Sequence, residues 1–141
     1  MISPELENLA RCGVLKREPP ARAEYEGLVA SAAARLADAA RPDLSLESRF
    51  DLAYNAAHAL ALAALRRMGY RSDSRYAVFQ VLPYTAGLPT ATWRFLAKCH
   101  ERRNLAEYEG ARSLDGRLID DLVCAAEELM KAVSALRPPG G

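Results

Sequence analysis

The 141-residue sequence contains only three cysteines and two histidines, and these low counts restrict the chemistry open to it. Cys12, Cys99 and Cys124 are widely spaced and form no CxxC pair, so neither a zinc site nor a disulfide framework is predicted. We expect all three thiols to be buried in a protein of a reducing compartment. Two histidines leave few side chains that exchange protons near neutral pH.

Sequence motifs for common cofactors and hydrolases are also lacking. The chain has no GxGxxG loop and no GxxxxGKS/T loop to hold phosphates. It has no HExxH motif, no histidine pair at metal-ligand spacing and no serine nucleophile elbow. We therefore expect no cofactor, no bound metal, and neither zinc-hydrolase nor serine-hydrolase chemistry.

Long apolar runs are missing as well. None approaches the roughly 18 residues of a membrane-spanning helix, and residues 1–5 lack the basic and apolar regions of a signal peptide. Half of the residues are nevertheless hydrophobic, which excludes a disordered chain. The sequence therefore predicts one cytoplasmic domain, covering residues 1–141, that buries a core without disulfides and has no membrane partner.

The net charge of +1 conceals an uneven distribution. From Arg66 to Arg103 the chain has eight basic and two acidic residues, a net charge of +6, whereas the remainder has 11 basic and 16 acidic residues. A basic segment in an otherwise acidic domain favours an anionic partner such as phosphate, nucleic acid or an acidic protein. The alternative is that solvated arginines only keep an alanine-rich bundle soluble.

The spacing of apolar residues predicts an all-α protein, an up-and-down bundle of about five to six helices. A short helix is expected over residues 3–13, the bundle over 20–137 and a frayed tail over 138–141. Ser45 should cap a long helix that ends at Met68, and the high alanine content of residues 51–65 marks it as the central helix. The other helices are expected between Pro20 and Pro42, over about 75–85, over 93–108 and from Ser113 to Leu136.

Arg103 occupies an unusual position in the helix predicted around it. At about 100° per residue, it lies on the apolar face with Leu96 and Cys99, opposite the solvated Arg94, Lys98 and Arg102. An arginine directed at a packed surface is costly unless it is paired or lines a site. His100, Asn104 and Tyr108 form a ridge beside it, and Glu107 is within reach of its guanidinium.

This cluster of an arginine, a carboxylate, an amide, an imidazole and a phenol is typical of a phosphate or ribose pocket. The alternative is a structural Arg103–Glu107 ion pair that orients two helices. A second polar group lies on the flank of the central helix, where Asp51 is expected to reach Arg103 and His58 to point into the same space. The members of this second group are Asp51, Tyr54, Asn55 and His58.

Three segments in this order resemble a HEPN domain (higher eukaryotes and prokaryotes nucleotide-binding). They are the central helix over residues 50–62, its glycine stop Met68-Gly69-Tyr70-Arg71, and the late segment Arg102-Arg103-Asn104-Leu105-Ala106-Glu107-Tyr108. The resemblance covers roughly residues 44–136. It implies a helical bundle that forms a homodimer through the motif-bearing helices, often beside a minimal nucleotidyltransferase, in a bacterial toxin–antitoxin setting.

The family's catalytic motif is an arginine, a polar residue and, four to six positions later, a histidine. Arg103 and Asn104 match its first two positions, but Tyr108 stands where the histidine belongs. Tyrosine, with a pKa near 10, is a poor proton carrier at neutral pH. The resemblance thus implies nucleotide or RNA binding without efficient RNase activity, with Tyr108 also a candidate for modification by the nucleotidyltransferase. The binding residues would be Arg102, Arg103, Asn104, Glu107 and Tyr108, with Asp51, Tyr54 and Asn55 as accessories.

Two alternatives remain open at the level of sequence. One is an active, metal-independent endoribonuclease toxin that uses Arg103 with His100 or His58 as catalytic residues. The other is a protein-interaction module, in which the polar cluster is only an interface ion pair.

Overall fold

The computed structural model describes residues 3–109 and 114–140, without the side chains of residues 104–109. Within these residues the protein is helical apart from one short two-stranded ribbon, which confirms the expected all-α bundle. The strands are β1 (Lys16–Arg17) and β2 (Tyr70–Arg71), and they pair antiparallel. The helices are α1 (Pro4–Arg11), α2 (Arg22–Ala39), α3 (Leu46–Arg67), α4 (Arg75–Gln80), α5 (Leu82–Thr85), α6 (Thr90–Glu109) and α7 (Gly116–Ser134).

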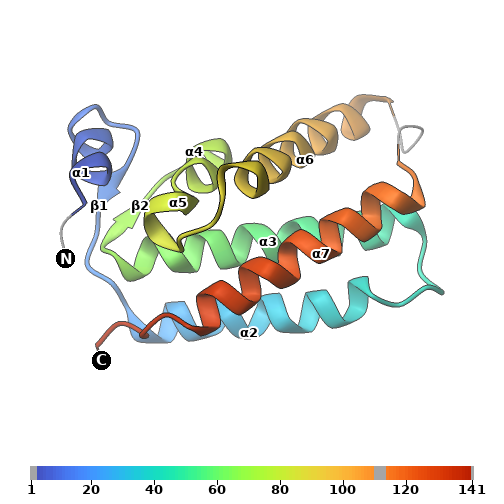
Figure 1. The fold of residues 1–141 in the computed structure, drawn as a ribbon, viewed down its shortest axis with the longest axis horizontal. Coiled ribbons are helices and arrows are strands. Elements are labelled where there is room, and N and C mark those ends of the chain that lie inside the picture. Colours follow the sequence, from blue (N-terminus) through green and yellow to red (C-terminus); the bar gives the residue numbers. More distant parts are fainter. Residues whose placement is uncertain (1–2, 110–113, 141) are drawn as a thin grey trace.

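Helix α3 is the central helix, as the alanine content predicts. Figure 1 shows α2 and α7 running along it on one side and the layer formed by α4, α5 and α6 on the other. All seven alanines between residues 51 and 65 are buried. Their small side chains let α2 and α7 approach the α3 backbone closely, so α3 is the fixed element on which the remaining helices are placed.

The helix boundaries follow local capping chemistry. Ser45 begins α3 by accepting a hydrogen bond from the amide of Ser48 (3.1 Å), and Met68 ends it, both as predicted. Helix α7 begins with Asp115, whose carboxylate accepts from the amide of Leu118 (2.7 Å). The earlier start predicted for this helix, Ser113, lies outside the described residues.

The structure divides the segment over 75–85 into two helices where one was expected. Helix α4 ends at Gln80, Val81 separates it from α5, and α5 carries Pro83 in its first turn. Proline has no amide hydrogen to continue the preceding helix and is tolerated only near a helix start. This break raises the number of helices in the described residues to seven, one more than the upper expectation.

A buried arginine fastens the N-terminal part of the chain to the end of α3. Arg66 is 2% exposed. Its Nε donates to a carboxylate oxygen of Glu24 (2.7 Å), and Nη1 and Nη2 donate to the carbonyls of Glu18 (2.9 Å) and Pro19 (2.7 Å). Because every side of the guanidinium is hydrogen-bonded, this arginine is structural.

The expectation of three buried thiols is wrong for two of them. Cys99 is buried on α6, whereas Cys12 and Cys124 are exposed. Cys12 is the C-cap of the peripheral helix α1, and Cys124 lines an open cleft between α6 and α7.

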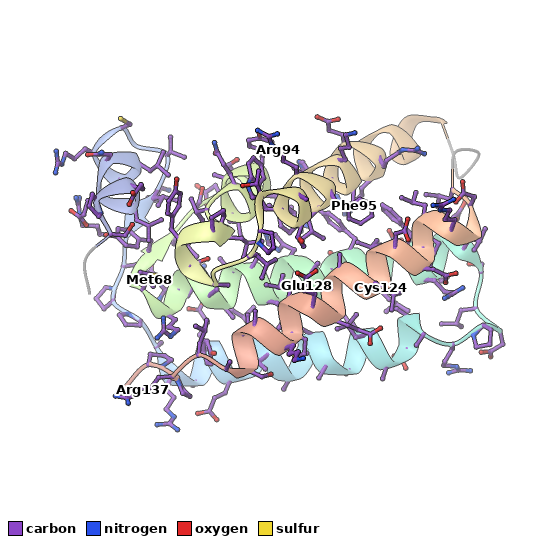
Figure 2. The ribbon with its side chains drawn as sticks, viewed as in Figure 1. Met68, Arg94, Phe95, Cys124, Glu128 and Arg137 are labelled. Carbon is purple, nitrogen blue, oxygen red and sulfur yellow. The ribbon has the colours of Figure 1, made fainter. Side chains whose placement is uncertain are left out.

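The segment after α7, expected to be frayed, lies against the end of α3. Arg67 Nε donates to the carbonyl of Arg137 at 2.6 Å, and Pro139 is buried. In Figure 2 Met68 and Arg137 mark this end of the molecule.

Among the described residues, none of the helices combines the length and apolar character that crossing a bilayer requires.

Candidate functional site

Several side chains singled out in the sequence meet around Tyr54 of α3. Its ring is completely buried, stacks parallel to Phe50 with centroids 6.2 Å apart, and contacts the edge of Phe79 at 6.0 Å. Its hydroxyl oxygen lies 2.8 Å from Nδ1 of His100 on α6. Tyr54 therefore joins α3, α4 and α6 at one point of the core.

Two arginines from different helices contact the same tyrosine ring. The Cζ atom of Arg103 on α6 lies 5.5 Å from the Tyr54 ring centroid, and that of Arg75 on α4 lies 5.6 Å from it. Both distances are within the range of cation–π attraction. Two positively charged side chains therefore contact the Tyr54 ring, and both are half-buried. We call Arg75, Arg103 and Tyr54 the arginine cluster.

The accessory residues on α3 lie next to this cluster. Asn55 Oδ1 accepts from Arg75 Nη1 at 3.4 Å, and Asn55 Nδ2 donates to the backbone carbonyl of Asp51 at 2.8 Å. Asp51 itself is exposed. Its ion pair with Arg103 stays a prediction, whereas Asn55 positions Arg75.

The environment of the cluster keeps His100 and Tyr54 uncharged. Burial, followed by the charges of Arg75 and Arg103, lowers the pKa of His100 below 6.5. Burial raises the pKa of Tyr54 above 10. At neutral pH a neutral imidazole therefore faces a protonated phenol, and the two share one hydrogen bond. The positive charge of the site comes from its arginines alone.

His58 of α3 lies in the same electrostatic environment. Its ring contacts the edge of Phe79 at a centroid distance of 5.9 Å. Burial, followed by the charges of Arg75, His100 and Arg103, lowers the pKa of His58 to about 4. His58 and Tyr54 therefore both contact Phe79, and His58 lies close enough to Arg75, His100 and Arg103 to be affected by their charges.

The depressed pKa of His58 predicts a loss of stability on mild acidification. As the pH falls through 6.5, the unfolded chain binds a proton at His58 before the folded chain does, so stability falls until about pH 4. The pKa difference corresponds to at most about 3 kcal/mol. Between pH 7 and pH 4, wild type should lose more unfolding free energy in urea titrations than His58→Gln. Parallel pH profiles for the two proteins would contradict this assignment.

The remaining predicted residues lie on or beyond the end of the described side chains. Arg94 and Lys98 are exposed and Arg102 is half-buried. The side chains of Asn104, Glu107 and Tyr108 lie outside the described residues, although the α6 backbone continues to Glu109. The Arg103–Glu107 contact therefore stays a prediction.

Sequence reasoning missed Arg75. It belongs to the basic segment and follows Ser74, which caps α4 by accepting from the Ala77 amide at 3.2 Å. The cap predicts a helix start but does not connect Arg75 with Tyr54, 21 positions earlier. That contact exists only because α4 packs on α3.

A different cleft lies between α6 and α7, with a volume of about 320 Å³. Figure 2 labels three of its lining residues, Phe95 from α6 and Cys124 and Glu128 from α7. Asp121 also lines it. Because its ionisable groups include two carboxylates and no arginine or lysine, this cleft is a poorer site for an anion than the arginine cluster.

No group of three histidine, cysteine, aspartate or glutamate side chains with metal-binding geometry exists among the described residues. The arrangement around Tyr54 suits an anion instead, because its charged groups are two guanidiniums. Comparisons with protein-family models, with curated proteins and with solved structures found no match to this chain.

Proposed function

We propose that this chain is a HEPN-like domain that binds the phosphate groups of a nucleotide or RNA at the arginine cluster. The observation that carries the proposal is the convergence of Arg75 and Arg103, from two helices, on one buried tyrosine ring. A guanidinium carries its N–H donors in a planar fork that matches two phosphate oxygens, so arginine suits a phosphate ligand. Arg94, Lys98 and Arg102 add further positive charge on α6, which favours an anionic ligand.

In this proposal the protein acts as a homodimer in which the α6 helices face one another, as the resemblance implies. Two copies of Arg103 then line one cleft. Asn104 and Tyr108 contact base or sugar, Glu107 orients Arg103, and Arg102 adds positive charge at the rim. A minimal nucleotidyltransferase is the proposed partner protein, within a toxin–antitoxin system.

The proposed domain holds RNA without cutting it efficiently. Tyr108 occupies the position of the motif histidine. His100 lies near Arg103, which favours the ribonuclease alternative, but its Nδ1 is hydrogen-bonded to Tyr54 and its pKa is lowered. A lowered pKa makes the imidazole a weaker general base.

The test is incubation of purified protein with labelled RNA in the absence of metal, using wild type, Arg103→Ala and His100→Gln. We expect intact RNA in every lane, and RNA retained by dimeric wild type in a gel-shift assay at low salt. Cleavage by wild type that disappears in both variants would establish the ribonuclease alternative. Folded wild type that retains no RNA or nucleotide at low salt would favour the protein-interaction module.

A further inference from the structure

We propose that Tyr76, Tyr84, Trp93 and Arg94 form a base-stacking site for single-stranded RNA, which we call the aromatic groove. The inference rests on the proposed function, because the RNA would reach this groove from the arginine cluster. It goes further in naming the ligand class, a single strand with accessible bases, and a second site that contacts it.

The groove is an open depression of about 500 Å³ between α1, the α4–α5 turn and α6. Tyr84, Trp93 and Arg94 line it, together with Pro83 and Leu9. Tyr84 is 48% exposed, so part of its ring is open to a ligand in this depression. The groove thus offers flat aromatic surface to solvent beside a cationic group.

The aromatic side chains are already arranged around Trp93. Tyr76, 44% exposed, lies beside the lining rather than in it, and its ring is perpendicular to that of Trp93 with centroids 6.1 Å apart. Arg94 places its Cζ atom 5.8 Å from the Trp93 ring centroid. Aromatic rings interleaved with arginine are typical of sites where successive bases stack while the arginine contacts phosphate.

The start of α4 connects the groove with the arginine cluster. Arg75 and Tyr76 are consecutive in the first turn of α4, and Arg75 extends to Tyr54 while Tyr76 extends to Trp93. A strand whose phosphate lies on Arg75 and Arg103 therefore has its neighbouring bases at Tyr76. Bases of a duplex are already stacked on one another, so only a single strand can use both sites.

The charges around the groove determine on which side the phosphates and the bases of the RNA would lie. Arg94 is the exposed cation on the α6 side, and Glu5 is the carboxylate in the lining on the α1 side. Ser3 donates a hydrogen bond to Glu5 at 3.0 Å. Phosphates should therefore lie along Arg94, with bases and sugars directed toward Glu5.

Trp93 is the only tryptophan and reports directly on stacking. Titration of the full protein with a short oligouridylate should quench its fluorescence. Loss of two stacking rings in Tyr76→Ala/Tyr84→Ala should weaken binding at least about tenfold. Tyr76→Phe/Tyr84→Phe keeps both rings and should bind like wild type, as should Val14→Ala, which removes an exposed apolar side chain outside the groove lining.

Inorganic pyrophosphate separates the two proposals, because it carries phosphate but no base. It should bind wild type and the double alanine variant equally. Equal oligouridylate affinity for wild type and the alanine variant, or equal quenching by duplex RNA, would overturn the aromatic groove and leave the phosphate site standing. Wild type that binds neither oligouridylate nor pyrophosphate would overturn both.

Discussion

Replacing Arg66 with alanine is expected to lower the free energy of unfolding by about 3 kcal/mol. The guanidinium is buried and donates to the Glu24 carboxylate and to the carbonyls of Glu18 and Pro19. Its removal takes this donor from the carbonyls of Glu18 and Pro19 and leaves Arg71 as the remaining partner of the Glu24 carboxylate. The cost of unpaired buried polar groups exceeds the net value of the bonds themselves. Urea unfolding followed by far-ultraviolet circular dichroism measures the difference.

The neighbouring Arg67 provides a matched control. It is half-buried, and Nε donates to a single carbonyl, that of Arg137. Arg67→Ala should therefore cost less than about 1 kcal/mol. Equal effects of the two substitutions would show that Arg66 does not fasten the N-terminal part of the chain to α3.

The architecture was predictable because its determinants are local. Serine at position 45, alanine throughout residues 51–65 and glycine at position 69 together predict α3, which the structure places from Leu46 to Arg67. Gly69 has a positive φ of 88°, the conformation that ends the helix and favours glycine. The division into α4 and α5 was missed, although Pro83 was the available signal.

The site was predictable only in part, because contacts between helices depend on register. Tyr54, His58, His100 and Arg103 were all proposed from their places on two amphipathic helices, and the structure brings them together. Helical periodicity also marked Arg103 as the arginine facing the core. The arginine that is almost fully buried is instead Arg66.

The residues that sequence reasoning overlooked have partners far away in the chain. Arg66 bonds to Glu24, 42 positions earlier, and Arg75 meets Tyr54 across the α3–α4 contact. Neither partner can be read from spacing within one helix. Such pairs become visible only when the packing of one helix on another is known.

Removing both arginines of the cluster is expected to weaken binding of single-stranded RNA at least about 100-fold. A hydrogen bond from a charged group contributes about 1.5–3 kcal/mol, and Arg75→Ala/Arg103→Ala removes two such donors. The loss of two phosphate contacts should also reduce the slope of log affinity against log salt concentration by about 1.4. Fluorescence anisotropy of a labelled oligouridylate at several salt concentrations measures both quantities.

The most direct test of the account compares the dissociation constants of wild type, Arg75→Ala/Arg103→Ala and Arg22→Ala/Arg35→Ala. The last variant removes the same charge from exposed positions on α2, away from Tyr54. The account predicts a loss of at least about 100-fold for the cluster variant and a small, salt-sensitive change for the control. Equal affinities of the two folded variants would contradict a phosphate site at Arg75 and Arg103.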